Sequence, residues 1–160
     1  MEIERKWHMK SFPELPVKTH TRMEQSYLSI VPELRIRKYT DLMGEKPDKF
    51  ELTIKSEGTL AREEINKELT REEYEILLNM NGNLPPVVKD HRTYDYNGYV
   101  LEFSVVDPGR STAFSYAEVE FPTVEEAEAF KPPEWFGRET TNAKDFRMRK
   151  YWQATRLRDK

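Results

Sequence analysis

Cysteine is absent from this chain of 160 residues, and histidine is scarce. Without thiols the protein can form neither disulfides nor thiolate zinc sites, and a catalytic cysteine is excluded. Two of the three histidines, His8 and His20, show no spacing that would suggest metal ligands. A reducing compartment is the environment that this composition fits.

Long apolar runs are also missing. No segment approaches the roughly 18 consecutive apolar residues that read as a membrane-spanning helix. The N-terminus lacks the apolar core of a secretory signal peptide, and a cleavable leader would remove the charged residues Glu2 to Lys6. We therefore expect a cytoplasmic protein that does not act at a membrane.

Charge of one sign is not in excess. The chain has 26 Lys and Arg against 29 Asp and Glu, a formal net charge of −3, although 34% of its residues are charged. This balance disfavours a general nucleic-acid or anionic-membrane binder, which usually needs a clear basic excess. Balanced charges fit either a well-solvated surface or opposed groups in one site, and their positions must decide.

The sequence does contain many short segments that predict β-strands. Turn residues such as Asn97-Gly98 and Asp107-Pro108-Gly109 separate several of them, and such short connections favour antiparallel neighbours. With 37% hydrophobic residues, the length suits one domain over residues 1–160. The predicted strands are 1–9, 23–31, 33–40, 48–56, 62–69, 88–96, 99–106 and 115–121.

Capping residues and apolar spacing predict helices as well. Thr70 and Glu73 have the spacing of a capping box, and Thr123 and Glu126 repeat it ahead of a segment that Pro132-Pro133 should stop. A third helix is expected from about Thr141 to Leu157, with aromatic side chains near a core: Phe146, Tyr151 and Trp152.

Most predicted strands have one charged face and one apolar face. In an ordinary barrel the apolar faces point inward, but amphipathic helices could cover apolar faces that point outward. The alternative is a half-solvated sheet whose charged face meets water, and periodicity alone leaves both arrangements open. In the inside-out barrel the lumen would hold Glu2, Glu4, Glu64, Glu68, Glu102, Glu118 and Glu120 with Lys6, Arg35, Arg37 and Lys55.

Several short motifs occur in an order that resembles one superfamily. The N-terminal Glu2-Ile3-Glu4-Arg5-Lys6 has the pattern Glu-x-Glu-x-Lys. It is followed by Gln25-Ser26-Tyr27-Leu28, Leu34-Arg35-Ile36-Arg37, Leu52-Thr53-Ile54-Lys55, Arg62-Glu63-Glu64 and Ala117-Glu118-Val119-Glu120-Phe121. Over roughly residues 1–150 these motifs resemble the CYTH superfamily, also called the triphosphate tunnel metalloenzymes, in particular bacterial inorganic triphosphatases.

The resemblance implies both a fold and an activity. The fold is α+β, a closed eight-stranded antiparallel β-barrel that forms a tunnel with a charged lumen and helices packed outside. The implied enzyme is a triphosphatase, a hydrolase that splits inorganic triphosphate (tripolyphosphate) into diphosphate and phosphate by in-line attack of water, with Mg²⁺ or Mn²⁺ as cofactor. Other members act on thiamine or nucleoside triphosphates or cyclise ATP, and a non-catalytic polyphosphate-binding module is an alternative of another class. The implied partner is a small polyanion rather than nucleic acid or membrane, and members are often homodimers.

Roles for individual residues also follow from the resemblance. The implied metal ligands are Glu2, Glu4, Glu118 and Glu120, with Glu64 and Glu102 as further candidates. The implied substrate-binding residues are Lys6, Arg35, Arg37, Lys55, Lys89, Arg92, Tyr27 and Arg147, although Tyr27 could equally be a packed barrel aromatic. The expected catalytic residues are Glu4, Lys6 and Lys55. No general base is identified; a carboxylate, or Lys55 with a lowered pKa, could serve.

The predicted strand at 88–96 departs from the family pattern, in which a Lys and an Arg alternate. Lys89 and Arg92 are three residues apart, so a regular strand would point them to opposite faces unless a bulge intervenes. We expect Arg92 in the lumen and His91 outside. Three further positions differ from the residues common in the family: Asn66, Ser104 and Met148.

Overall fold

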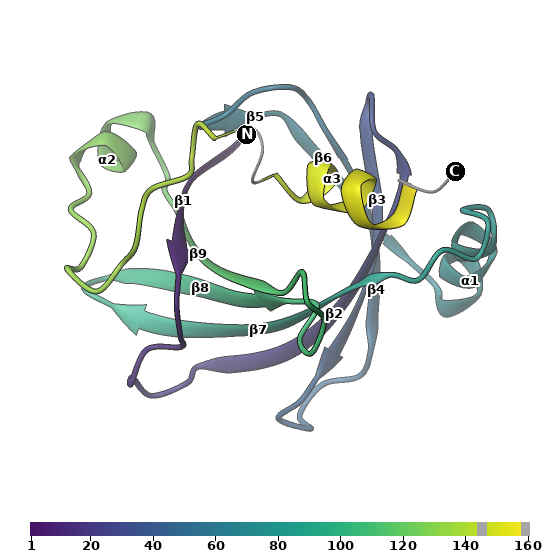
Figure 1. Ribbon diagram of the computed structural model, residues 1–160, viewed down its shortest axis with the longest axis horizontal. Coiled ribbons are helices and arrows are strands. Elements are labelled where there is room, and N and C mark those ends of the chain that lie inside the picture. Colours follow the sequence, from purple (N-terminus) through teal and green to yellow (C-terminus); the bar gives the residue numbers. More distant parts are fainter. Residues whose placement is uncertain (144–146, 158–160) are drawn as a thin grey trace.

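The structure, a computed structural model, describes residues 1–143 and 147–157, and its nine strands form one antiparallel sheet that curves into a nearly closed ring (Figure 1). The order of strands around the ring is β5-β1-β9-β8-β7-β2-β3-β4-β6. Their bounds are β1 (Glu2–Met9), β2 (Thr19–Ser29), β3 (Glu33–Asp41), β4 (Lys49–Lys55), β5 (Ala61–Arg62), β6 (Glu64–Leu69), β7 (Val87–Tyr96), β8 (Tyr99–Val106) and β9 (Phe114–Glu120).

The ring closes through two short strands that follow each other in the chain. β5 pairs with β1, where Ile3 lies opposite Ala61, and β6 pairs with β4, where Lys55 lies opposite Glu64. Only Glu63 separates β5 from β6. The predicted fold class is therefore confirmed, but the strand count differs from eight because the strand expected at 62–69 is divided in two.

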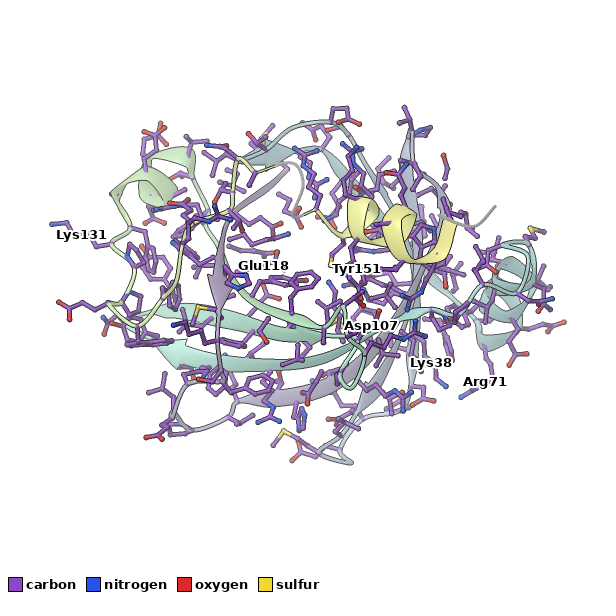
Figure 2. The ribbon with its side chains drawn as sticks, viewed as in Figure 1. Lys38, Arg71, Asp107, Glu118, Lys131 and Tyr151 are labelled. Carbon is purple, nitrogen blue, oxygen red and sulfur yellow. The ribbon has the colours of Figure 1, made fainter. Side chains whose placement is uncertain are left out.

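The apolar faces of the strands point away from the lumen, as the inside-out arrangement requires. One outer cluster joins Trp7, Phe103 and Val119 of the barrel to Ala127 of α2 (Val124–Ala129) and to Phe136. Figure 2 shows the contrast between the faces: Glu118 is directed into the ring, whereas Lys131 points away from it. The molecule thus buries apolar residues between the barrel and the segments packed outside it, and its charged side chains line the lumen.

Helix α1 (Arg71–Asn79) covers the opposite side of the barrel. Its Tyr74 packs on Phe50, with ring centroids 5.1 Å apart, and both join Ile36 in a buried cluster. The predicted capping box is confirmed, because Thr70 Oγ1 accepts from the Glu73 amide and Glu73 Oε1 accepts from the Thr70 amide. The box fixes where the helix starts after β6, so that its apolar face meets the sheet.

The third helix begins later than expected. The segment before it is tied to β1, since the Thr140 amide donates to the Lys6 carbonyl at 2.7 Å and Thr141 Oγ1 accepts from the Lys6 amide at 3.0 Å. Helix α3 spans only Met148–Trp152 and continues as a π-helical turn, Gln153–Leu157. The predicted core residue Phe146 lies outside the described residues.

The position of α3 also corrects the expectation that every helix packs outside. Its Met148 and Trp152 contact barrel residues whose side chains face inward at one end of the ring: Tyr27, Val87, Val106 and Tyr116. The helix therefore covers that end of the lumen, as its place across the ring in Figure 1 shows. In the described part of the chain, no helix combines the length and apolarity needed to cross a membrane.

Candidate active site

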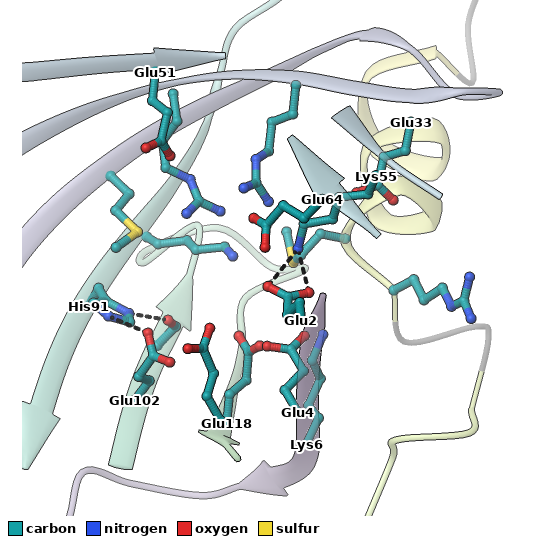
Figure 3. A pocket seen from close by; sticks show the side chains of 18 of the residues that line it. Glu2, Glu4, Lys6, Glu33, Glu51, Lys55, Glu64, His91, Glu102 and Glu118 are labelled. Carbon is teal, nitrogen blue, oxygen red and sulfur yellow. Dashed lines mark hydrogen bonds and ion pairs between the residues drawn. The ribbon is translucent and has the colours of Figure 1, made fainter. Parts of the chain in front are cut away.

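The barrel encloses a charged cavity of about 250 Å³ (Figure 3). Eight carboxylates line it, Glu2, Glu4, Glu33, Glu51, Glu64, Glu102, Glu118 and Glu120. Seven bases share the same space, Lys6, Arg35, Arg37, Lys55, Arg62, Lys89 and Arg147. Acids and bases of separate strands therefore converge on one lumen, which is the inside-out arrangement that the resemblance implies and that alternation alone left open. Glu68 is an exception, because it is exposed and does not line this cavity.

The register of β1, β8 and β9 gathers the carboxylates on one wall. Glu4 lies opposite Glu120, and Glu118 lies opposite both Lys6 and Glu102. Glu2, Glu4 and Glu120 each offer one carboxylate oxygen within 4.8 Å of the other two. Three carboxylate oxygens this close form a donor set of the hard, anionic kind that Mg²⁺ and Mn²⁺ prefer.

Crowding changes the protonation of these acids. Burial, and then the Glu118 charge, raise the pKa of Glu4 well above its usual value. Burial and repulsion by Glu102 raise the pKa of Glu120 to about 7. Burial would also raise the pKa of Glu118, but the positive charge of Lys6 and its neighbours outweighs burial and lowers it. A divalent cation at Glu2, Glu4 and Glu120 would offset the repulsion that keeps protons on this wall.

The opposite wall carries the arginines of β3. Arg37 is held by Gln25, whose Oε1 accepts from Nε at 3.1 Å and from Nη2 at 2.7 Å. Arg35 is buried as well, and its Nε has no hydrogen-bond partner within residues 1–143 and 147–157. A buried guanidinium with a free donor costs desolvation energy that an anion in the lumen would recover.

Two lysines of the lumen differ in their surroundings. Lys55 Nζ donates to Glu2 Oε1 at 2.9 Å and is paired. Lys89 is buried and donates to the Tyr116 hydroxyl, while burial and the nearby Arg37 charge lower its pKa well below the usual value. Burial also raises the pKa of Tyr116, which keeps that hydroxyl protonated. The Lys89 amine therefore becomes neutral more readily than that of an ordinary lysine.

The expected orientation of β7 is wrong. The register of β7 with both neighbours runs without interruption, so its residues alternate and Lys89 and His91 face the lumen. Arg92 lies outside the cavity, with its guanidinium 3.8 Å from the Phe12 ring centroid and its Nε 3.3 Å from Asp90 Oδ1. The segment after β1 that supplies Phe12 gives Arg92 a stacking partner on the outer face, and no bulge turns it inward.

Ser104, which differs from the residue common in the family, contacts His91. His91 is 8% exposed, its Nδ1 lies 3.0 Å from Ser104 Oγ, and its Nε2 lies 3.5 Å from Glu102 Oε1. Asn66, a second departure, accepts a hydrogen bond from Thr53 at 2.7 Å. Ser104 and Asn66 are therefore both hydrogen-bonded within the lumen wall.

The remaining predicted residues lie at the lumen, with their roles still predictions. Tyr27 lines the cavity and also packs on Trp152 at 5.9 Å, and burial raises its pKa to about 12. Arg147 lines the cavity from the segment before α3 and donates to the Gly58 carbonyl. Glu64 and Glu102 line it as well.

Sequence reasoning did not single out several lumen residues as members of the site. They are Glu33, Tyr39, Glu51, Arg62, His91 and Tyr116. Strand alternation could have found them, because each has the same parity as a predicted residue of its own segment, such as Glu51 with Lys55. Arg62 bridges two acids, with Nη2 3.8 Å from Glu2 Oε1 and Nη1 3.3 Å from Glu33 Oε1.

Comparisons with known proteins point in the same direction. No protein-family model matches the chain. The chain is 29% identical over 160 aligned residues to an inorganic triphosphatase of Nitrosomonas europaea, which covers 91% of this chain and 93% of that protein. The solved structure of the inorganic triphosphatase NE1496 is similar with a TM-score of 0.63 and 25% identity, over 94% of this chain and 93% of that one. A putative adenylate cyclase from Bacillus halodurans shares the fold, with a TM-score of 0.56 and 14% identity over 81% of this chain and 84% of the other. Lumen, barrel and relatives together confirm what the motifs indicate, namely that the chain resembles the CYTH superfamily in sequence and in fold.

Proposed function

We propose that this protein is an inorganic triphosphatase that hydrolyses tripolyphosphate to diphosphate and phosphate with Mg²⁺ or Mn²⁺. The observation that carries the proposal is the lumen itself, where a cluster of three carboxylates faces a wall of arginines and lysines inside one 250 Å³ cavity. The similarity to proteins named inorganic triphosphatase supports the choice of substrate.

Substrate binding is assigned to the basic residues of the lumen. Lys6, Arg35 and Arg37 come from β1 and β3 and line the same cavity, so they can neutralise a linear polyanion from more than one side. Arg37 is already held by Gln25, which reduces the ordering that binding must impose on it. Lys55 can exchange Glu2 for a phosphate oxygen once a cation occupies the acidic wall.

The acidic wall is assigned to the metal. Glu2, Glu4 and Glu120 would hold the ion, with Glu64, Glu102 and Glu118 close by on the lumen wall. A divalent ion bound there would polarise phosphate oxygens and lower the pKa of a bound water. Glu4 is therefore assigned a catalytic role, because its carboxylate oxygen would be a ligand of the metal.

Hydrolysis also needs a group that accepts the proton of the attacking water. Lys55 is a poorer candidate than the sequence suggests, because it is paired with Glu2. Lys89 fits better, since its lowered pKa leaves the amine neutral more readily and Arg37 lies nearby. Arg35, Arg37 and Lys6 can then stabilise the charge that develops on the departing diphosphate.

The test is release of phosphate from tripolyphosphate, ATP and thiamine triphosphate, each with and without Mg²⁺ or Mn²⁺. We expect metal-dependent turnover that favours tripolyphosphate. Tight binding of tripolyphosphate without turnover would instead indicate a polyphosphate-binding module, and preferred turnover of ATP or production of cyclic AMP would indicate another activity of the superfamily.

Two variants connect the assay to the two walls. Glu4→Gln should abolish the metal-dependent rate, whereas Arg37→Ala should mainly raise KM, because the arginine contacts the phosphates in both ground and transition states. Lys131→Ala, whose side chain points away from the barrel, is the matched control. Wild-type turnover in the first two variants would contradict the assignment.

Other expectations from the sequence stay predictions. They are a single domain over residues 1–160, a cytoplasmic location and a homodimer. Absence of cysteine supports the location, and balanced charge supports a small polyanion rather than nucleic acid as the partner.

A further inference from the structure

We propose that Glu51 limits the length of the polyphosphate that the lumen accepts, and that its carboxylate excludes chains longer than tripolyphosphate. This inference rests on the proposed function, since it concerns the same lumen. It goes beyond that function by naming the residue that selects among inorganic polyphosphates.

Glu51 is a carboxylate on the wall that carries the phosphate-binding arginines. It lies directly opposite Arg37 in the pairing of β3 with β4, its side chain is 16% exposed, and it lines the lumen (Figure 3). The cluster Glu2, Glu4 and Glu120 is the candidate metal set, and Glu51 is not a member of it. Its carboxylate is therefore available to act on the substrate rather than on that ion.

Hydrogen bonds hold Glu51 in place beside Arg37. Tyr39 donates from its hydroxyl to Glu51 Oε1 at 2.8 Å, and the same hydroxyl lies 3.3 Å from Arg37 Nη1. Gln25 binds the other two nitrogens of Arg37. Glu51 Oε2 also lies 3.6 Å from Nζ of Lys49, whose side chain is 54% exposed, so that water screens this ion pair on the lysine side. A phosphate placed beyond Arg37 would face a Glu51 carboxylate whose charge Lys49 offsets only in part.

Steric closure does not explain such a limit. A second pocket of about 360 Å³ adjoins the lumen, because Met23, Tyr39 and His91 line both spaces. This outer pocket is also lined by three lysines, Lys18, Lys46 and Lys49, and by two acids, Asp41 and Glu45. A second cavity that contains lysines therefore lies beyond Tyr39, and Glu51 lines the lumen on the near side of that tyrosine. Removing its charge should open a path rather than destroy a site.

The repulsion would act selectively on longer chains. A tripolyphosphate that lies between the acidic wall and Arg37 keeps its phosphates beside bases, whereas a fourth phosphate must pass Glu51. Two negative charges brought close together repel each other appreciably even in a partly solvated site. We expect Glu51→Gln to raise the preference for tetrapolyphosphate over tripolyphosphate about tenfold, which corresponds to about 1.4 kcal/mol.

The experiment measures kcat/KM and Kd for tripolyphosphate and for tetrapolyphosphate with wild type and three variants. Glu51→Gln keeps an oxygen for the Tyr39 hydroxyl but removes the charge, whereas Tyr39→Phe removes the hydrogen bond but keeps the charge. Glu45→Gln removes an exposed carboxylate of the outer pocket and is the matched control. We expect kcat/KM for tetrapolyphosphate to rise relative to kcat/KM for tripolyphosphate in Glu51→Gln alone, and the two Kd values to change in the same sense.

The outcomes separate this inference from the proposed function. If wild type turns over tripolyphosphate but Glu51→Gln leaves both ratios unchanged, Glu51 only positions Arg37 and the length limit is wrong. A ratio that rises equally in Tyr39→Phe would also overturn it, because position rather than charge would then matter. If tripolyphosphate binds without turnover, the Kd ratio alone decides the length limit while the triphosphatase proposal fails. If tripolyphosphate neither binds nor reacts, both proposals fail.

Discussion

At the scale of single residues, the lumen works through what neighbouring charges do to each other. Glu118 and Glu4 lie on adjacent strands, yet the pKa of Glu118 is lowered and that of Glu4 is raised. Burial and the Glu118 charge raise the pKa of Glu4, whereas the positive charge of Lys6, which lies opposite Glu118 in the strand pairing, outweighs burial and lowers the pKa of Glu118. The lumen thus holds one acid that is ionised, Glu118, and one that is easily protonated, Glu4. A bound cation would favour the ionised form of Glu4 as well.

Lys89 gives a pH prediction at this scale. Its lowered pKa means that the amine loses its proton at a lower pH than an ordinary lysine, so activity that needs the neutral amine rises with pH through that pKa and falls below it. We expect Lys89→Gln to lower kcat by about 10²–10⁴ and to remove the acid limb of the rate profile. Phosphate release measured from pH 5 to 10 tests this, with Lys131→Gln as the control. An unchanged acid limb in Lys89→Gln would assign the proton to another group.

How well the sequence predicted residues depends on how local their cause is. Glu2, Glu4 and Lys6 follow from alternation within one strand, and all three line the lumen. Alternation also places Lys89 and Arg92 on opposite faces, but it does not say which of them faces the lumen, and Phe12, which stacks on Arg92 outside, belongs to a segment far away in the chain. His91 was missed because it has the parity of Lys89, so that the expectation of Arg92 in the lumen placed His91 outside.

At the scale of elements, strands and capped helices were predictable, and the C-terminal segment was not. Thr70 and Glu73 fix the start of α1 through bonds within four residues. The C-terminal segment depends instead on contacts far apart in the chain, because residues 140 and 141 hydrogen-bond to β1 and Arg156 pairs with Asp107. Such contacts across the whole chain have no signature in local sequence.

The ion pair between Arg156 and Asp107 anchors the helix that covers one end of the lumen. Both side chains are 1% exposed, Arg156 Nη1 lies 2.9 Å from Asp107 Oδ2, and Nη2 lies 3.1 Å from Oδ1. Arg156→Gln would leave a buried carboxylate without its counter-charge, which costs about 3–5 kcal/mol in the free energy of unfolding.

Denaturant unfolding measures this loss. Gln153→Ala, three residues before Arg156 in the same π-helical segment, is the control and should change stability far less. Because tertiary contacts of α3 with Tyr27 and Tyr116 would loosen, we also expect a higher KM for tripolyphosphate in Arg156→Gln. A variant as stable as wild type would show that apolar packing of Trp152 alone holds the helix.

At the scale of the whole molecule, the barrel keeps its apolar residues between sheet and cover and collects charge at its centre. This arrangement costs free energy, because the ionised carboxylates of the lumen repel each other when no cation is present. Burial and repulsion raise the pKa of Glu120 to about 7, so in the absence of metal the folded state binds this proton more tightly than the unfolded chain does. That contribution to stability is complete below the usual glutamate pKa and is lost as the pH rises through about 7.

A divalent cation should reverse this trend, because it binds the deprotonated carboxylates and therefore stabilises the fold more at pH 8 than at pH 5. With Mg²⁺ at about 100 times its Kd, mass action adds about 2.7 kcal/mol, which corresponds to an increase in Tm of about 5–10 °C for a chain of this size. Thermal unfolding at both pH values, with and without Mg²⁺, measures the effect. Glu4→Gln should reduce the increase at pH 8, whereas Glu125→Gln, an exposed acid of α2, should keep it. An increase of the same size at both pH values, or one that Glu4→Gln leaves intact, would mean that the ion binds elsewhere and that the acidic wall is not the metal site.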